Sequence, residues 1–180
     1  MKKKLKALEI TYYVASSFDG FIATEDGGVD WLKPFQETGE DHGAAELQGS
    51  VDALLLGSHT YEFALKFGQW PSPNIPSWVF TRRKLKKLHP SIALTSQTPR
   101  QVVDLLAARG MRHAWLMGGG KLATSFREEG LISRYVINIM PIILGRGIPL
   151  FAPSGSHTPL VLQSAKPFKS GIVQLIYNNV

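Results

Sequence analysis

Residues 115–151, WLMGGGKLATSFREEGLISRYVINIMPIILGRGIPLF, decide the fold. The apolar run 115–117 is typical of a buried strand, and it leads through three glycines into a helical segment that Gly130 closes. A second apolar run, 135–140, ends in a turn rich in proline and glycine. A strand that passes through glycines into a helix presents bare backbone N–H groups at the helix N-terminus, which suits a phosphate. The stretch therefore predicts a strand–helix–strand unit with a phosphate-binding turn.

The composition predicts one domain, over residues 1–180. This length can bury a substantial core, and 44% hydrophobic with 19% charged residues is ordinary for a soluble globular protein. No apolar run approaches the ~18 residues that cross a bilayer, and the basic start MKKKLKALEI lacks the apolar region of a secretory signal. We therefore expect a cytoplasmic protein with no membrane partner. Because cysteine is absent, disulfides and thiolate chemistry are excluded.

The net charge of +6 suits a polyanionic ligand. Much of this charge lies in two clusters, at residues 2–6 and 82–87, and the first is typical of a solvated tail. Neither an RNA-binding signature nor zinc spacing accompanies them, and the isolated His42 and His59 form no metal-binding pattern. We therefore expect a small-molecule ligand, no metal and no nucleic acid. Nucleic-acid binding through 82–87 is an alternative that predicts steeply salt-dependent DNA affinity.

Strand and helix signals alternate over the first 140 residues. Strand-like runs lie at 8–16, 53–56, 77–81, 92–94, 115–117 and 135–140. Helical patterns lie at 38–48, after an expected N-cap at Ser58, and after a capping box formed by Thr98, Pro99 and Gln101. The apolar runs 160–165 and 172–177 add an antiparallel pair. This order predicts an α/β fold with a mixed, mostly parallel sheet in a three-layer αβα arrangement.

Three segments follow predicted strands at the edge of the sheet where α/β proteins bind ligands, beyond the carboxyl ends of the strands. These segments are 57–60, 81–83 and 118–120. Together they favour an extended ligand that carries phosphates, and a dinucleotide fits better than a mononucleotide. The G-x-G-x-x-G fingerprint is absent after the first strand, so a dinucleotide fold other than the Rossmann fold is expected.

Six motifs in a fixed order carry a resemblance to a known family. They are VASSFDGFIA at 14–23, DGGVDWL at 26–32, DALLLGSHTYE at 52–62, WVFTRR at 78–83, WLMGGGKLATSF at 115–126 and PIILGRGIPLF at 141–151. This set resembles the dihydrofolate-reductase-like superfamily, on the branch that holds the reductase domain of riboflavin biosynthesis and its stand-alone relatives. The resemblance covers residues 10–177 and implies an eight- or nine-stranded mixed sheet. It also implies NADPH as hydride donor, a homodimer, and a cis peptide between Gly118 and Gly119.

The resemblance also implies a set of cofactor-binding residues. They are Ala15, Gly20, Ile22, Gly57, Ser58, Thr60, Thr81, Arg82, Arg83, Gly118, Gly119, Gly120, Lys121 and Leu122. The glycines of 118–120, with Lys121 and the Thr60 hydroxyl, would hold the pyrophosphate. Arg82 and Arg83 would face the 2′-phosphate of NADPH, because a planar guanidinium makes bidentate bonds to such a group. Ala15 and the loop 20–22 would flank the nicotinamide.

The chain departs from the family pattern at two places. Ser58 stands where folate reductases carry an arginine, so either the cationic role has moved to Arg82 and Arg83 or the preference for NADPH is weaker. The acidic pair that related reductases often carry is absent from 131–134, LISR. The second departure motivates an alternative, a non-catalytic NADP(H)-binding or regulatory protein.

Hydride transfer also needs a proton for the substrate, often from a carboxylic acid. Asp41 lies 16 residues before Gly57, the spacing at which folate reductases place their carboxylate, although Thr38 and Asp41 also have the form of a capping box. Asp19 is the second candidate, and its Asp-Gly dipeptide is equally typical of a turn. Trp31 is the best candidate for stacking on a flat substrate, and burial in the core is its alternative.

These patterns lead to the hypothesis of an NADPH-dependent reductase. Its substrate would be a small heterocycle or a ribosylaminopyrimidine such as 5-amino-6-(5-phosphoribosylamino)uracil, reduced at a C=N or C=O bond. The deaminase signature of the bifunctional riboflavin enzyme is absent from the sequence, which predicts a monofunctional reductase. A true dihydrofolate reductase is the other alternative, and Ser58 and the SSFDGFIA segment count against it.

Overall fold

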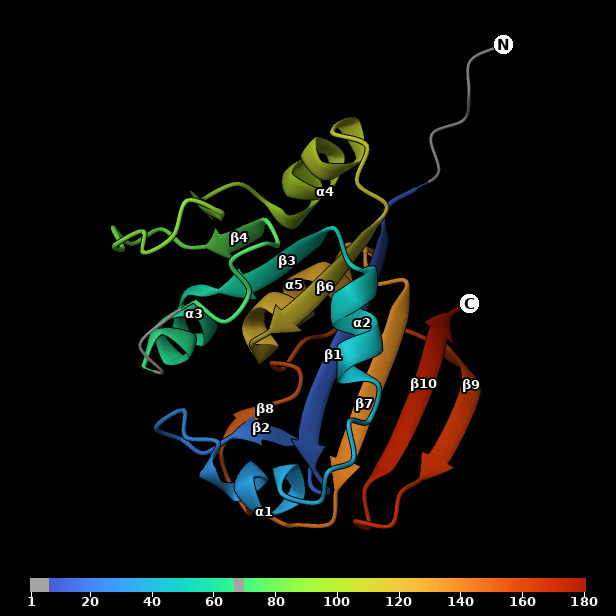
Figure 1. Cartoon of the computed structure of the whole chain (residues 1–180). Helices are drawn as coiled ribbons and strands as arrows, with labels where there is room; N and C mark the ends of the chain where they lie inside the picture. Colours follow the sequence, from blue (N-terminus) through green and yellow to red (C-terminus); the bar gives the residue numbers. More distant parts are fainter. Residues whose placement is uncertain (1–6, 67–69) are drawn as a thin grey trace.

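The computed structural model of the chain describes residues 7–66 and 70–180. Its main sheet has eight strands in the order β5-β4-β3-β6-β1-β7-β10-β9 (Figure 1). These strands are β1 (Glu9–Ser17), β3 (Ala53–Gly57), β4 (Ser77–Phe80), β5 (Ile92–Thr95), β6 (His113–Gly118), β7 (Arg134–Met140), β9 (Leu160–Pro167) and β10 (Val173–Asn179). All pairs from β5 to β7 are parallel, and β10 is antiparallel to both of its neighbours. The predicted mixed, mostly parallel sheet is therefore confirmed.

Helices cover both faces of the sheet (Figure 1). The helices are η1 (Asp30–Leu32), α1 (Lys33–Gln36), α2 (Ala44–Ser50), α3 (Ser58–Leu65), α4 (Pro99–Ala108) and α5 (Gly120–Glu128). One core cluster joins α4 and α5 to residues such as Tyr12 and Leu116, and the other joins α3 to Leu54 and Leu56. Successive side chains of a strand point to opposite faces of the sheet, and here they enter different clusters. The layers are therefore helix, sheet and helix, as predicted. In the described part of the chain, no helix is long and apolar enough to cross a membrane.

The start of α4 forms as predicted. Thr98 is its N-cap and accepts a hydrogen bond from the backbone of Gln101, whose side chain in turn accepts one from the Thr98 backbone. Pro99 occupies the first turn, where its missing N–H has no cost. Two short-range signals therefore agree on where this helix begins.

Two other helix starts differ from the predictions. The predicted capping box of Thr38 and Asp41 does not form, and α2 begins only at Ala44. The reason is that Gly39, His42 and Gly43 all have positive φ, so residues 39–43 cannot be helical. Ser58 is not an N-cap either. The extended Gly57 takes that position without any side-chain bond, and Ser58 is the first residue of α3.

A small sheet closes the carboxyl-terminal side of β1. It pairs β2 (Phe21–Ala23) with β8 (Ile148–Pro149). The Asp19 carboxylate stabilises the approach to this sheet, because it accepts the N–H groups of Leu144 at 3.1 Å and Gly145 at 2.7 Å. It also accepts the Ser17 hydroxyl at 2.6 Å. We call the segments 17–22 and 141–147, joined through Asp19, the carboxylate clamp.

Hydrogen bonds within the carboxylate clamp predict how stability depends on pH. The Ser17 hydroxyl first, and then the two backbone N–H groups, lower the pKa of Asp19 from its ordinary value of 3.8. The unfolded chain then takes up this proton at a higher pH than the folded chain, so the stabilisation is complete at pH 7 and is lost as the pH falls below ~4. We expect Asp19→Asn to unfold at lower urea concentration than wild type at pH 7, and the difference to shrink at pH 3.

Urea unfolding at both pH values, followed by circular dichroism, measures this effect. Asp104→Asn is the matched control because Asp104 is an exposed carboxylate of α4, away from the clamp. That variant should keep the acid sensitivity of wild type. An equal difference between wild type and Asp19→Asn at pH 7 and pH 3 would contradict the prediction.

Candidate functional site

The glycine-rich ends of β3 and β6 meet beyond the carboxyl edge of the sheet. The register pairs Leu56 with Gly118, and a Cβ placed on Gly57 would lie 3.7 Å from the Gly118 carbonyl oxygen. A Cβ on Gly119 would lie 3.8 Å from both the Thr60 hydroxyl oxygen and the Ile22 Cδ1 atom. The structure thus brings together cofactor residues that were predicted on three separate segments. The peptide between Gly118 and Gly119 is cis, as the resemblance implies.

The start of α5 lies beside this junction and requires glycine. A Cβ on Gly120 would lie 2.1 Å from the Pro149 carbonyl oxygen of β8, far inside any allowed contact. Gly119 is the N-cap of α5, and no side chain bonds to the first N–H groups of the helix. The start of α5 therefore combines N–H groups that no side chain caps with the positive end of a helix dipole, which favours a bound anion. Lys121 is exposed, and Leu122 packs on the core below.

Residues with hydroxyl and guanidinium groups follow the neighbouring strands at the same edge of the sheet as the glycines. Ser58 and Thr60 lie in the first turn of α3, and neither hydroxyl takes part in a hydrogen bond within residues 7–66 and 70–180. Gly57 pairs with Phe80, so Thr81 and Arg82 follow on the neighbouring strand just beyond the same edge. The Thr81 backbone N–H bonds to Thr95, which extends the strand pairing to this point.

The two predicted arginines differ in their surroundings. Arg83 donates to the Glu62 carboxylate at 2.6 Å, and both side chains are partly exposed. Arg82 is exposed and forms no hydrogen bond or ion pair with the described residues. Arg82 is thus a cation without a partner among the described residues, whereas Arg83 is already paired. The pairing of Arg83 is a property that the sequence analysis did not predict.

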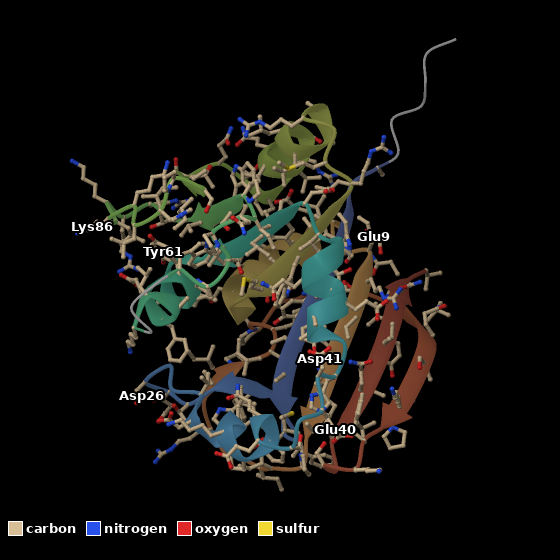
Figure 2. All side chains as sticks on the ribbon, in the orientation of Figure 1. Glu9, Asp26, Glu40, Asp41, Tyr61 and Lys86 are labelled. Atoms are coloured by element: carbon tan, nitrogen blue, oxygen red, sulfur yellow. The ribbon has the colours of Figure 1, made fainter. Side chains whose placement is uncertain are left out.

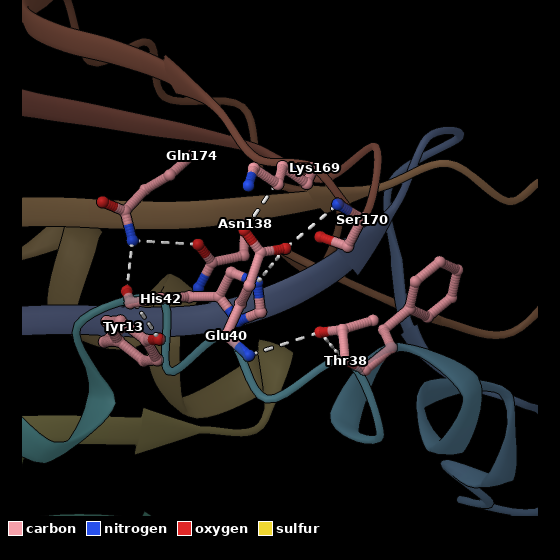
Figure 3. A network of polar contacts seen from close by, with 9 residues as sticks. Tyr13, Thr38, Glu40, His42, Asn138, Lys169, Ser170 and Gln174 are labelled. Carbon is pink, nitrogen blue, oxygen red and sulfur yellow. Dashed lines mark hydrogen bonds and ion pairs between the residues drawn. The ribbon is translucent and has the colours of Figure 1, made fainter.

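A polar network covers the face of the sheet next to Ala15 (Figure 3). Its hub is the backbone carbonyl of His42, which accepts the Gln174 amide at 2.6 Å and the Tyr13 hydroxyl at 3.2 Å. The Gln174 amide also donates to Asn138 at 3.0 Å, and Asn138 pairs with Ala15 across β1 and β7. Because His42 has φ +54, an uncommon conformation for a residue with a side chain, these bonds hold a strained turn in place.

Sequence reasoning missed this network. Asn138 in YVINIM and Gln174 in IVQLIY are polar residues within otherwise apolar strands, and this was the signal that could have found them. A buried polar side chain needs a partner, so each such residue predicts another polar group on the same face of the sheet. The partner itself, a backbone carbonyl at a left-handed turn, leaves no signal in the sequence.

Asp41 lies beside the network and above a surface hollow. Figure 2 places Asp41 and Glu40 near β7 and β10, away from Tyr61 on the α3 side. The hollow has a volume of about 500 Å³ and is lined by Glu40, Asp41, His42, Gly43, Glu46, Lys166, Pro167, Phe168, Lys169 and Gln174. Burial raises the pKa of Tyr13, and the nearby charge of Asp41 raises it further. A hydrogen bond from Asn138 acts in the opposite direction and lowers this pKa. The Asp41 carboxylate is therefore close to Tyr13, on the face that carries Ala15.

The contacts of both predicted catalytic carboxylates are structural. Asp41 is exposed and accepts the Ala45 N–H at 3.1 Å, which caps the first turn of α2. The Asp19 carboxylate oxygens accept three hydrogen bonds within the carboxylate clamp. A catalytic role for either residue stays a prediction, and the contacts of Asp19 favour its turn alternative.

Trp31 lies in η1, where its side chain is partly exposed. Its indole N–H is buried and has no hydrogen-bond partner among the described residues. A ligand with an acceptor atom would satisfy this donor, since tryptophan N–H groups are normally paired when buried. The predicted role of Trp31 in substrate binding stays a prediction. Among residues 7–66 and 70–180, no three His, Asp or Glu side chains are grouped so that they could hold a metal ion.

Solved structures share this architecture. A putative riboflavin biosynthesis protein from Shewanella sp. PV-4 superimposes with a TM-score of 0.87 at 26% identity, over 96% of this chain and 99% of the other. The Thermotoga maritima diaminohydroxyphosphoribosylaminopyrimidine deaminase/5-amino-6-(5-phosphoribosylamino)uracil reductase gives a TM-score of 0.71 at 16% identity, over 97% of this chain and 57% of the other. At that identity, the second likeness shows the fold alone.

Sequence relatives cover nearly the whole chain. The uncharacterized protein YwjB of Bacillus subtilis is 33% identical over 166 residues, which are 92% of this chain and 94% of that protein. The family model of the RibD C-terminal domain matches residues 9–174. This range begins with β1 and ends in β10, so it contains the glycine junction, the carboxylate clamp and the polar network. The chain belongs to the RibD C-terminal domain family, whose members have a reductase-type enzyme domain.

Proposed function

We propose that the protein is an NADPH-dependent reductase of a small ribosylaminopyrimidine-like or heterocyclic substrate. The observation that carries the proposal is the bare glycine backbone at the uncapped start of α5, beside Thr60 and Gly57. Membership of a family with a reductase-type domain supports the reaction class. The similarity to the putative riboflavin biosynthesis protein from Shewanella sp. PV-4 supports a substrate class that includes 5-amino-6-(5-phosphoribosylamino)uracil and related compounds.

The residues present fit a phosphate-bearing dinucleotide. Gly119 and Gly57 leave room that a Cβ would fill, next to a hydroxyl that has no partner in the described part of the chain. The N–H groups at the start of α5 would donate to the pyrophosphate, and the Thr60 hydroxyl would add a further bond. The unpaired Arg82 would bind the 2′-phosphate, because a guanidinium offers two parallel donors to a phosphate. Bound there, the cofactor would supply a hydride from nicotinamide C4.

The remaining residues prepare the substrate side. The carboxylate clamp fixes the loop that carries Gly20 and Ile22, and the Gly20 carbonyl accepts the Leu150 N–H at 2.9 Å. The polar network fixes the turn that carries Asp41 over the strand position of Ala15. Asp41 would hold the proton that the reduced substrate takes up, either directly or through a water molecule. Trp31 would bind an acceptor of the substrate with its unpaired N–H.

A non-catalytic NADP(H)-binding protein is the second candidate. It is favoured by the structural contacts of both carboxylates, since Asp41 caps α2 and Asp19 holds the clamp. Such a protein would bind the dinucleotide at the same glycines and would transfer no hydride. Binding and turnover therefore have to be measured separately.

The proposed function predicts which cofactor the protein prefers. We expect the protein to bind NADPH at micromolar concentration and NADH more weakly. Arg82→Ala should weaken NADPH binding about 10- to 100-fold, the effect of losing charge-assisted bonds to a phosphate, and should leave NADH binding nearly unchanged. Arg83→Ala should have a smaller effect because Arg83 is paired with Glu62. Titration followed by nicotinamide fluorescence measures both dissociation constants.

Lys84→Ala is the matched control, since Lys84 is an exposed cation two residues beyond Arg82. It should leave both dissociation constants at their wild-type values. Equal loss in Lys84→Ala and Arg82→Ala would mean that only general positive charge attracts the nucleotide. Absence of binding by either nucleotide to wild type would refute the reductase proposal.

The proposed function also predicts which residue donates the proton. Asp41→Asn keeps a group that can cap α2 but removes the acid, so we expect kcat to fall about 10²- to 10⁴-fold with unchanged NADPH affinity. The measurement is NADPH oxidation with 5-amino-6-(5-phosphoribosylamino)uracil, a pterin and a flavin as substrates. Glu46→Gln is the control because Glu46 lines the same hollow as an exposed carboxylate. Turnover at the wild-type rate in Asp41→Asn would remove Asp41 from catalysis. NADPH binding without turnover of any substrate by wild type would favour the non-catalytic candidate.

A further inference from the structure

A surface hollow is formed by the end of α5, the start of β7 and the segment between β8 and β9. Its volume is about 330 Å³, which is within the range of small-molecule sites. Its lining includes Arg127, Tyr135, Phe151, Ala152 and Leu160. The glycine junction lies at the other end of α5, because Gly120 precedes Arg127 by about 10 Å of helix. The hollow is therefore separate from the candidate functional site.

The guanidinium of Arg127 is held in place by three contacts. Its Nη1 group donates to the Ser156 carbonyl and to the Thr158 hydroxyl, both at 3.0 Å. The group also lies over the Phe151 ring, 5.9 Å from the ring centroid, which is a cation–π distance. Its Nε and Nη2 groups have no partner among the described residues, and no carboxylate of those residues pairs with it. Arg127 therefore presents a fixed positive charge with one open edge of two parallel N–H donors.

The phenol of Tyr135 adds another donor. Tyr135 is 2% exposed, and its hydroxyl has no partner among residues 7–66 and 70–180. Burial raises the pKa of Tyr135, and the positive charge of Arg127 acts in the opposite direction, so the hydroxyl lies near the guanidinium. A buried hydroxyl without a partner has lost its hydrogen bonds to water. An acceptor placed beside both groups would restore that bond and also meet the charge of Arg127.

The other polar side chains of the hollow are already paired. The Ser154 hydroxyl donates to the Glu128 carboxylate, and the Thr158 hydroxyl accepts from Arg127. The open polar positions are thus two N–H groups that can only donate and one hydroxyl that can donate. Donors grouped around a positive charge without a counter-ion favour an anion.

We propose that this hollow binds a small monocarboxylate with an apolar body. The two carboxylate oxygens accept the Nε and Nη2 groups of Arg127 as a bidentate pair, and one oxygen also accepts the Tyr135 hydroxyl. The apolar body packs against Phe151 and Ala152 and covers Leu160, which is 39% exposed. The proposal rests on the hollow alone and does not depend on the proposed reaction.

The charge balance favours a carboxylate over a phosphate. The described residues that line the hollow include one cation, Arg127, which carries a single positive charge. A phosphate monoester carries about −1.5 to −2 charges at pH 7, so part of its charge would remain without a partner beside apolar side chains. A monocarboxylate matches the single positive charge, and its planar shape matches the open edge of the guanidinium.

Titration of the full chain with benzoate, followed by heteronuclear NMR of the backbone amides, tests the proposal. We expect saturable shifts that cluster at Arg127, Tyr135 and residues 151–160, with a dissociation constant of about 1 mM or lower, as for a ligand of this size. Benzyl alcohol lacks the charge and acetate lacks the apolar body, so each should bind at least about fivefold more weakly. NADPH should not displace benzoate, because the glycine junction is a different site.

Two variants test the assigned donors. Tyr135→Phe removes only the hydroxyl and should raise the dissociation constant of benzoate about tenfold, the effect of one lost hydrogen bond to a charged acceptor. Arg127→Gln removes the charge and should raise it by at least about tenfold. Arg112→Gln is the matched control, because Arg112 is an exposed arginine that does not line the hollow, and it should bind benzoate as wild type does. Circular dichroism checks that all three variants are folded.

The other outcomes overturn the proposal. Wild type without saturable shifts has no such site, and shifts confined to residues 57–60 and 118–122 would place benzoate at the glycine junction instead. Equal weakening by Arg127→Gln and Arg112→Gln would mean that general positive charge attracts the anion. Benzyl alcohol that binds as tightly as benzoate would show that the hollow does not recognise a carboxylate. Affinity for benzoate that neither Tyr135→Phe nor Arg127→Gln changes would exclude both assigned donors.

Discussion

The close passage of β8 over the start of α5 is the contact on which the site depends. The Pro149 carbonyl lies where a Cβ of residue 120 would be, so only glycine permits this crossing. The Tyr12 hydroxyl donates to the Leu150 carbonyl at 3.1 Å, and Gly147 lies against the Ala23 carbonyl so closely that its Cβ would be 2.2 Å away. Segments from three distant parts of the chain therefore interlock at one point. That packing buries Gly120 and leaves Gly119, the N-cap of α5, partly exposed.

Much of the fold could be predicted because its signals are local. Runs of apolar residues between turn signals give the parallel strands, and Thr98 with Pro99 gives the start of α4. The rule that ligands bind beyond the carboxyl ends of parallel strands then brings 57–60 and 118–120 together without any tertiary information. The predicted start of α2 was wrong because the true start depends on positive φ at His42. Tertiary hydrogen bonds impose this conformation against the local preference.

The polar network of Gln174, Asn138 and His42 could not be predicted, since its contacts depend on strand register. Gln174 reaches Asn138 because β10 and β7 pair at that register, and a shift by one residue would turn Gln174 to the opposite face. The sequence shows that both residues are polar within apolar strands, but the register that aligns them comes from the packing of the whole sheet. The same holds for Arg83, whose pairing with Glu62 joins the end of β4 to α3.

The positions of the two carboxylates bear on how a substrate could be protonated. Hydrogen bonds from Ser17, Leu144 and Gly145 keep Asp19 ionised, with a lowered pKa, so it is a poor proton donor at neutral pH. In the proposed reaction its effect would be indirect, through the loop that it holds. Asp41 differs in its contacts, because its carboxylate accepts one backbone N–H, is open to solvent and lies near the partly buried phenol of Tyr13. Water can reach the Asp41 carboxylate directly and relay a proton through it, whereas three donors already occupy the oxygens of Asp19.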